Sequence, residues 1–311
     1  MKCINISNRE ISASSPTFII AELSANHNQQ FEVAVETIKA AKEAGAYAVK
    51  LQTYTADTIT LDSQNECFQI KHGTLWDGKT LHQLYQEAYT PWEWQPKLKE
   101  VAEDIGLICF SSPFDKTSVD FLEKMEVPAY KIASLEITDI PLIEYVASKG
   151  KPVIISTGVA TLTDIEEAVN ACKRAGNNQI ALLKCTSVYP TPFEDANLRT
   201  IPNLAETFKV LVGLSDHTLG ISVPIASVVL GARIIEKHFI LNRDLGGPDV
   251  AFSLDPSEFE QMVTHVREVE KALGTVTYEL TEKAKASREY ARSLFVVEDI
   301  KAGDVLTEQN I

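Results

Sequence analysis

The sequence predicts an α/β fold, a (β/α)8 (TIM) barrel followed by the start of a small second domain. Eight short apolar runs rich in β-formers recur along the chain, and amphipathic helical segments lie between most of them. Strands that alternate with helices favour right-handed parallel crossovers, and eight such units in roughly 250 residues are typical of a closed barrel. A doubly wound open sheet is the alternative, which is disfavoured because no GxGxxG motif follows the first run.

The predicted elements follow one another in a regular order. Residues 1–17 form an N-terminal segment, and the barrel occupies residues 18–275. Its predicted strands lie at residues 18–23, 47–53, 106–112, 129–134, 152–158, 180–187, 210–217 and 233–239. Two of the helices between them, residues 31–45 and 163–176, end in glycine, which is common at helix C-termini.

Residues 54–96 interrupt the alternation of strands and helices, because a connection between a strand and the next helix usually has about 2–6 residues. The segment contains LWDGKTLHQLYQEAYTPWEW, which is rich in aromatic and turn-forming residues. Two interpretations stay open. The segment is either a packed surface excursion or a lid over the barrel mouth, where long loops carry function.

The end of the chain forms a second interruption. Residues 276–292 are polar and helical and are predicted to be a linker, whereas residues 293–311 are β-like and contain a KAGD turn. About twenty residues are too few for an independent domain. The sequence therefore predicts the beginning of an incomplete β domain at 293–311.

Composition excludes several functional classes. The net charge of −14 argues against a nucleic-acid surface, which needs basic residues. The longest apolar stretch, residues 221–232, is shorter than the roughly 20 residues of a membrane span, and no signal peptide is recognisable. Five scattered cysteines without a CxxC pair argue against a disulfide framework or a zinc ribbon. We therefore expect a cytoplasmic protein that binds neither nucleic acid nor membranes.

All eight predicted strands end in polar residues, and the active site of a barrel forms at these carboxyl ends. Side chains alternate along a strand, so polar residues two positions apart share one face. Eight polar ends together predict a functional cleft. In strand order the residues are Glu22 and Ser24, Lys50 and Gln52, Ser111 and Ser112, Lys131 and Ser134, Ser156 and Thr157, Lys184 and Thr186, Ser215 and His217, and Glu236 and His238.

Two of these residues, His217 and His238, suit a divalent metal ion. They end neighbouring strands, which lie about 4.8 Å apart, so both imidazoles can reach one ion. No third His or Cys lies near them in sequence, which argues against a closed structural zinc site. Water and substrate oxygens are expected to complete the shell, as in catalytic metal sites.

Lysines and hydroxyls at the other strand ends suit an anionic ligand, because lysine supplies a point charge and serine a short donor. The alternative is a Schiff-base lysine, as in barrel aldolases, where desolvation lowers the pKa of the amine. The pattern fits both uses. The candidate residues are Lys50, Lys131, Lys184, Ser112, Ser134, Ser156 and Ser215.

Ten motifs, in order from Phe18 over nearly the whole chain, resemble the sialic acid synthase family. The ELSANHN form of the first motif and the LWDGK segment most closely resemble its pseudaminic acid synthase branch. The neuraminate and legionaminate branches usually carry a glycine in the first motif. The motifs are FIIAELSANHN, AVKLQTY, LWDGKTLHQLYQEAYTPWEW, CFSSPFD, YKIASLE, ISTGVAT, LKCTSVYPT, VGLSDHTLG, GARIIEKHF and FSLD.

The resemblance implies a barrel followed by a small antifreeze-like (SAF) β-clip domain, exchanged between the subunits of a homodimer. It implies condensation of phosphoenolpyruvate with an acetamido-sugar aldehyde, favouring 2,4-diacetamido-2,4,6-trideoxy-L-altrose, to a nonulosonic acid and phosphate. The metal is expected to be Mn2+ or Mg2+. A neuraminate or legionaminate synthase is the alternative. A Schiff-base aldolase, a non-catalytic sugar-binding barrel and a metal hydrolase are more remote.

The resemblance also implies residue roles. His217 and His238 match the metal ligands, and Glu136 of KIASLE matches the candidate acid or base, with Glu22 and Lys131 as further catalytic candidates. Ser187 stands where some relatives have Asn, and an arginine that contacts the sugar in the family falls beyond residue 311. Contacts to the sugar or the intermediate match Glu22, Gln52, Phe114, Tyr189 and Asp249, and contacts to phosphoenolpyruvate match Lys50, Ser112, Lys131, Ser134, Ser156, Lys184 and Ser215.

Overall fold

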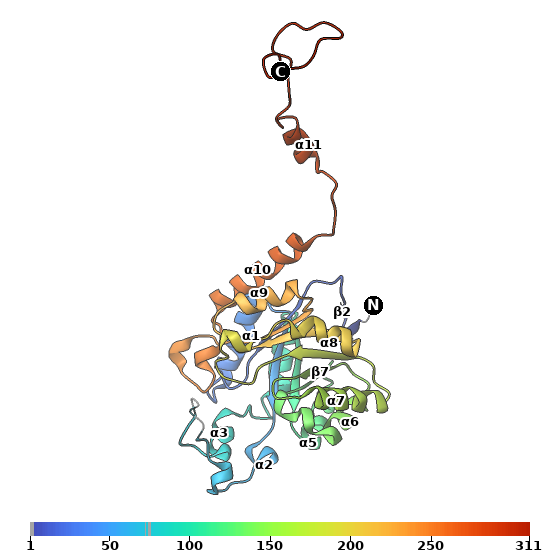
Figure 1. Ribbon diagram of the computed structural model, residues 1–311. Helices are drawn as coiled ribbons and strands as arrows, with labels where there is room; N and C mark the ends of the chain where they lie inside the picture. The colour runs from blue at the N-terminus through green and yellow to red at the C-terminus, as the bar shows by residue number, and fades with distance from the viewer. Residues whose placement is uncertain (1–2, 72, 74–75) are drawn as a thin grey trace. The chain divides into compact units, whose positions relative to one another are not determined.

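The computed structural model describes residues 3–71, 73 and 76–311. Eight parallel strands form a closed barrel in the order β10-β3-β4-β5-β6-β7-β8-β9 (Figure 1). The closed order confirms the predicted (β/α)8 barrel and rules out the open sheet. The strands are β3 (Phe18–Glu22), β4 (Ala48–Thr53), β5 (Ile108–Pro113), β6 (Tyr130–Ile132), β7 (Val153–Ser156), β8 (Ile180–Lys184), β9 (Leu211–Asp216) and β10 (Ile234–His238).

Helices follow the strands and cover the outside of the barrel. Gly45 and Gly176 come just after α1 and α7 with φ of 91° and 80°, as the predicted C-caps require. Among the described residues, no helix is long and apolar enough to cross a membrane. The helices are α1 (Phe31–Glu43), α4 (Gln95–Asp104), α5 (Lys116–Lys124), α6 (Ile140–Ala147), α7 (Leu162–Arg174), α8 (Thr200–Phe208), α9 (Ser222–Val229) and α10 (Pro256–Leu273).

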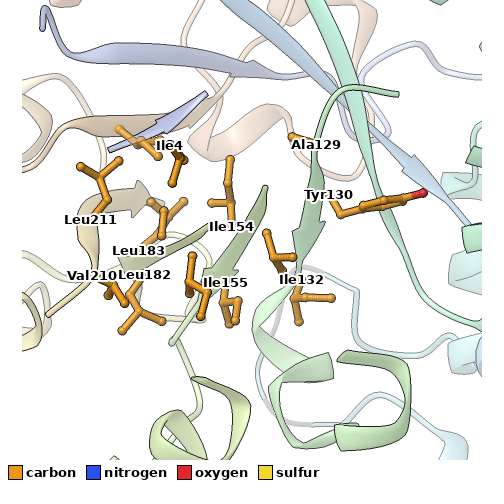
Figure 2. Close-up of a cluster of buried hydrophobic side chains, with 14 of the residues drawn as sticks. Ile4, Ala129, Tyr130, Ile132, Ile154, Ile155, Leu182, Leu183, Val210 and Leu211 are labelled. Carbon is orange, nitrogen blue, oxygen red and sulfur yellow. The ribbon is translucent and has the colours of Figure 1, made fainter. Parts of the chain in front are cut away.

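The N-terminal segment forms an antiparallel hairpin of β1 (Ile4–Ile6) and β2 (Arg9–Ile11). Its isoleucines are buried in one cluster with residues from the first half of several barrel strands. Figure 2 shows Ile4 beside Ile154, Leu183 and Leu211. The hairpin therefore closes the N-terminal end of the barrel with apolar side chains.

Residues 54–96 fold into the short helices α2 (Ala56–Ile59), η1 (Glu66–Phe68) and α3 (Leu81–Ala88) before α4 begins. A capping box starts α3, because Thr80 Oγ1 accepts from Gln83 N at 3.2 Å and Gln83 Oε1 accepts from Thr80 N at 3.0 Å. Helices α2 and α3 lie at the opposite end of the barrel from β2 (Figure 1). The segment thus lies at the C-terminal mouth, where a lid is expected.

Residues 274–311 form a separate compact unit, which contains α11 (Glu282–Arg288). No strand occurs in residues 289–311, all of which the structure describes. The β structure predicted for residues 293–311 is therefore not formed here. Leu294, Phe295 and Val305 are 83%, 71% and 77% exposed, so this short segment lacks the apolar partner that a strand needs for stability.

Candidate active site

Four charged side chains form one network inside the C-terminal half of the barrel. Lys50 forms an ion pair with Glu22, and its Nζ lies 3.9 Å from Glu236 Oε2. Lys131 Nζ lies 3.2 Å from Glu236 Oε1. All four residues are buried, with at most 5% of their surface exposed. These four residues are called the ionic floor below.

Burial disfavours the charged form of every group on the ionic floor, but the pKa values of the two carboxyls shift in opposite directions. Burial raises the pKa of Glu22 to about 7, against the attraction of Lys50 and with the repulsion of Glu236. Burial also acts on Glu236, but Lys131 and Lys50 outweigh it and lower the pKa. Glu236 is therefore firmly ionised, whereas Glu22 is able to exchange a proton near neutral pH.

Two of the predicted serines attach to the ionic floor. Ser112 Oγ accepts a hydrogen bond from Lys50 Nζ at 3.3 Å. Ser215 Oγ donates to Glu236 Oε1 at 3.0 Å. Both serines are buried. They hold the network in place from β5 and β9, the strands that carry them.

The other two serines, Ser134 and Ser156, lie at the ends of β6 and β7. Ser134 Oγ accepts from the Gly158 backbone N–H at 3.1 Å. A Cβ at Gly158 would lie 2.7 Å from Ser134 Oγ and 2.2 Å from Ser187 Oγ, so glycine is required for this close approach. Ser156 Oγ is buried without a hydrogen-bond partner among the described residues, which is typical of a group that a ligand satisfies.

Lys184 is not brought into this group, contrary to the prediction from strand alternation. On β8, Leu183 is in register with Gly213 and packs against the inner half of the barrel, so Lys184 lies on the side that faces the helices. Its Nζ donates to Cys185 O at 2.6 Å and to Thr186 Oγ1 at 2.9 Å. The neighbouring Cys185 takes the inward position instead.

His217 and His238 lie side by side, as their place on neighbouring strands predicts. Their ring centroids are 5.3 Å apart. His217 Nδ1 donates to Thr186 O at 3.1 Å, which leaves Nε2 available. His238 Nδ1 is buried, finds no hydrogen-bond partner in the described parts of the chain, and lies 3.7 Å from Asp249 Oδ2.

These two imidazoles fit a divalent ion as an open site. Both are buried side by side, each with a ring nitrogen available. Burial lowers the pKa of His238, which keeps it neutral as a ligand must be, whereas for His217 the neighbouring Cys185 and the Thr186 carbonyl outweigh burial and raise the pKa, so a bound ion would displace a proton there. The described residues contain no group of three or more His, Cys, Asp and Glu side chains that could hold a metal ion. A bound ion would therefore take its other ligands from water and substrate.

Glu136 stands in the 3-10 helix η2 (Ser134–Thr138), directly after β6. Burial raises its pKa to about 7, only partly offset by its own backbone N–H and by Lys131. Within the described structure its Oε2 is buried and makes no hydrogen bond. A carboxyl in this state is suited to proton transfer near neutral pH.

A cavity of about 520 Å³ opens at the C-terminal mouth and reaches Glu136 and His238. Its polar side includes Ser24, Gln52, Ser134 and Asp249. Its other side is apolar and aromatic and comes mainly from the segment 54–96. The residues of this apolar wall are Tyr54, Ile59, Ile70, Leu81, Leu84, Tyr85 and Ala88.

Of the five residues predicted to contact the sugar or the intermediate, Glu22 belongs to the ionic floor and the other four line this cavity. Gln52 Nε2 donates to Glu22 Oε1 at 3.2 Å and so joins the cavity to the ionic floor. The Phe114 ring packs edge-on against Tyr54 at 5.1 Å, and the Tyr189 ring lies 4.4 Å from that of His217. The Asp249 carboxyl accepts weakly from Ala25 N at 3.4 Å, and burial raises its pKa.

Two features of the site were not assigned from the sequence. Glu236 was recognised as a strand-end residue, but the charge pairing with Lys50 and Lys131 gives it a role that only the barrel closure reveals. Its signal is its spacing of two from His238 on the same face. The apolar wall was missed although a signal was present, because four of its residues, Leu81, Leu84, Tyr85 and Ala88, follow the i, i+3, i+4, i+7 spacing of one face of α3.

Comparisons with known proteins agree with this geometry. The sequence profile of the NeuB family matches residues 37–278. The chain belongs to the NeuB family. This confirms the resemblance to the sialic acid synthases that the motifs indicated.

Relatives within the NeuB family extend the match over almost the whole chain. A pseudaminic acid synthase of Campylobacter jejuni (strain 81-176) is 49% identical over 294 residues, covering 94% of this chain and 85% of the relative. A pseudaminic acid synthase of Helicobacter pylori is 49% identical over 297 residues, covering 95% and 87%. The crystal structure of N-acetylneuraminic acid synthetase from Leptospira borgpetersenii, in complex with citrate, has a TM-score of 0.82 and 33% identity, covering 94% and 97%.

Proposed function

We propose that this chain is a metal-assisted transferase that condenses phosphoenolpyruvate with an acetamido aldose, giving pseudaminic acid and phosphate. The membership in the NeuB family and the two pseudaminic acid synthases at 49% identity support this function. The favoured sugar is 2,4-diacetamido-2,4,6-trideoxy-L-altrose. A divalent ion, Mn2+ or Mg2+, is the proposed cofactor, with His217 and His238 as its protein ligands.

One observation carries the proposal. Three buried polar atoms without hydrogen-bond partners among the described residues, Glu136 Oε2, Ser156 Oγ and His238 Nδ1, come from strand ends around one barrel mouth. Buried polar atoms are almost always hydrogen-bonded, so such a cluster points to a polar ligand. The lysines of the ionic floor favour a negatively charged ligand.

The residues of the site have distinct tasks in the proposed reaction. Lys50, Lys131 and the serines Ser112, Ser134, Ser156 and Ser215 hold the phosphate and carboxylate of phosphoenolpyruvate, a positioning and electrostatic role. Glu22, whose pKa is about 7, takes up a proton when this anion arrives and so reduces repulsion on the floor. The divalent ion, when bound, supplies Lewis-acid polarisation of the sugar aldehyde.

The bond changes follow from this arrangement. The electron pair of the C2–C3 double bond of phosphoenolpyruvate forms a C–C bond from the methylene carbon to the aldehyde carbon, which leaves C2 cationic. The π bond of the aldehyde opens, and its oxygen takes up a proton from water to become a hydroxyl. Water adds to the cationic C2 of the former phosphoenolpyruvate and gives a proton to Glu136. The C2–O bond to phosphate then breaks, the leaving phosphate takes up the proton of the C2 hydroxyl, and a ketone and free phosphate remain.

The apolar wall supports the choice of a deoxygenated sugar. Ile70 and Leu84 are buried at 8% and 9% exposure and offer no hydrogen-bonding group to a hydroxyl. A sugar hydroxyl against this wall would lose its bonds to water without replacement, whereas a C6 methyl group or an acetamido methyl group gains by burial. Contact with Ile70 and Leu84 would therefore disfavour neuraminate precursors, which carry a 6-hydroxyl.

We also propose a homodimer as the working form, with residues 293–311 contributing to subunit association. The support is the exposed apolar surface of this segment, including Val296 at 53% and Val297 at 67%. Light scattering coupled to size-exclusion chromatography tests this proposal. A monomer at all concentrations would contradict it.

The proposed function is tested by incubating the protein with phosphoenolpyruvate, Mn2+ and a panel of acetamido sugars, and identifying the products by mass. We expect phosphate release and a nonulosonic acid from the diacetamido trideoxy hexose, with lower rates for N-acetylmannosamine. Absence of product with every sugar would contradict the proposal. Borohydride trapping of a covalent lysine adduct would instead support the aldolase.

A further inference from the structure

The motif ELSANHN contributes Glu22 to the ionic floor and Ser24 to the cavity, but its remaining polar residues contact no proposed ligand site. Residues 26–29 form a tight turn that begins after three further residues beyond β3, and Asn28 and Gln29 in it have positive φ of 47° and 56°. Asn26 and His27 are completely buried. This Asn26–Gln29 turn is built almost entirely of side chains that bond to other loops.

Two asparagines of the turn bond to the loop that follows β10. Asn26 Nδ2 donates to Phe239 O and to Ser253 Oγ, both at 2.9 Å. Asn28 Nδ2 donates to Leu245 O at 2.7 Å and to Gly246 O at 3.1 Å. The amide groups thus fix the backbone on both sides of Pro248 and Asp249, which line the cavity.

The other two residues of the turn bond to the segment 54–96. His27 Nδ1 accepts from the backbone N–H of Gln29 at 3.1 Å, so its Nε2 donates to Thr90 Oγ1, also at 3.1 Å. Burial lowers the pKa of His27 to about 4, so the ring stays neutral and this pattern persists at neutral pH. Gln29 Nε2 donates to Tyr89 O at 2.5 Å and to Glu87 O at 3.2 Å.

The two segments held by the turn both line one cavity. The segment 54–96 provides the apolar wall, and the loop after β10 provides Pro248 and Asp249. The two segments also meet directly, because Trp76 Nε1 donates to Pro248 O at 3.2 Å. None of these contacts involves the ionic floor.

We infer that the Asn26–Gln29 turn positions the sugar-binding walls, with Asn28 and Gln29 as positioning residues for the sugar substrate and not for phosphoenolpyruvate. The inference rests on the proposed function for the identity of the ligand. The two substrates are then held by different parts of the molecule. The barrel strands hold the phosphoenolpyruvate side, whereas one turn holds the sugar side through its side-chain amides.

The sharpest test is Asn28→Asp, because aspartate keeps the shape and tolerates positive φ but presents oxygen to the carbonyls of Leu245 and Gly246. We expect the KM for the sugar to rise about 10-fold, from the loss of hydrogen bonds to two carbonyls. The kcat and the Kd for phosphoenolpyruvate, measured without sugar, stay within about 3-fold. Gln29→Ala should raise the sugar KM in the same direction without adding a charge.

Gln30→Ala is the matched control, since Gln30 is exposed and its side chain forms no hydrogen bond to the described residues. It should leave both constants unchanged. An unchanged sugar KM in Asn28→Asp and Gln29→Ala, or an equal weakening of both substrates, would overturn the inference.

Hydrogen exchange supplies a readout that does not depend on activity. In Asn28→Asp, the amides of residues 81–90 and 243–250 should exchange faster than in the wild type, while those of β4 and β6 stay protected. Unchanged exchange in both segments would contradict the positioning role even if the proposed reaction failed. Faster exchange in Asn28→Asp, found together with a wild-type protein that makes no product, would support the positioning role and reject only the proposed function.

Discussion

The two ends of the barrel interior are equally buried but chemically opposite. At the N-terminal end, Ile4, Ile6 and Ile11 of the hairpin close the barrel with apolar contacts. At the other end, the ionic floor places four charged groups at most 5% exposed. Apolar burial stabilises a fold directly, whereas the burial of charges is at best compensated by pairing. The first end serves stability and the second end serves binding and chemistry.

This difference predicts opposite responses to substitution. A change at the hairpin should alter the free energy of unfolding and leave the reaction unchanged. A change at the mouth should alter the reaction, and at some positions it should even stabilise the protein. Trade-offs of that kind are common where polar groups are kept buried for activity.

The largest expected effect is on metal removal. Treatment with EDTA followed by buffer exchange should lower phosphate release by about 1000-fold, because polarisation of the aldehyde is worth several kcal/mol. Added Mn2+ should restore the rate in the wild type, but much less in His238→Ala. Full activity in metal-free buffer would reject the role of His217 and His238 as ligands of a catalytic metal ion.

Glu136→Gln should lower kcat by at least about 100-fold, because the water that attacks C2 loses its base. The folded-state pKa of Glu136 is about 7, above the ordinary value of 4.5. The folded state therefore binds more protons, and stability falls as pH rises from about 4.5 to 7.

The glutamine variant has no carboxyl to ionise and therefore lacks this loss of stability at high pH. It should be more stable than the wild type above pH 7, on the order of 2 kcal/mol, and similar below pH 4.5. Thermal unfolding at pH 5 and pH 8 checks this difference. A variant with near-normal kcat, or with lower stability at pH 8, would reject the role of Glu136.

Ile6→Ala tests the opposite end of the barrel. Removal of a fully buried isoleucine should destabilise the protein by about 2–4 kcal/mol, while kcat and both KM values stay within about 2-fold at 25 °C. Denaturant unfolding and steady-state kinetics measure the two effects. Loss of activity in the fully folded variant would show that the two ends are coupled.

The smallest effect is expected at the apolar wall. Leu84→Ser should lower kcat/KM for the deoxygenated sugar by about 10-fold, because one methyl-sized contact is worth about 1–3 kcal/mol. The ratio of kcat/KM for the deoxygenated sugar to that for a 6-hydroxylated sugar should fall as a result. Leu61→Ser is the matched control, since Leu61 belongs to the same segment, is 66% exposed and does not line the cavity. An unchanged preference in Leu84→Ser would place the sugar elsewhere.

The barrel was predictable from the sequence because each strand has its own apolar run and polar end. The pairing of His217 with His238 followed from the same regularity. The inward direction predicted for Lys184 was wrong because it was inferred from the place of Lys184 at a polar strand end, whereas the register on β8 places Leu183 and Cys185 inside. The bonds of the Asn26–Gln29 turn depend on contacts between distant loops, which no local pattern encodes. The helical spacing of Leu81, Leu84, Tyr85 and Ala88 was a local signal for the apolar wall, but the cavity that these residues face depends on the tertiary fold.

A crystal structure of the protein with Mn2+ and phosphoenolpyruvate tests the central claim most directly. We expect an ion held by His217 and His238, and a phosphoenolpyruvate anion that accepts hydrogen bonds from Lys131 and from Ser156 Oγ. An ion bound elsewhere, or phosphoenolpyruvate outside the barrel mouth with Ser156 still without a partner, would contradict it.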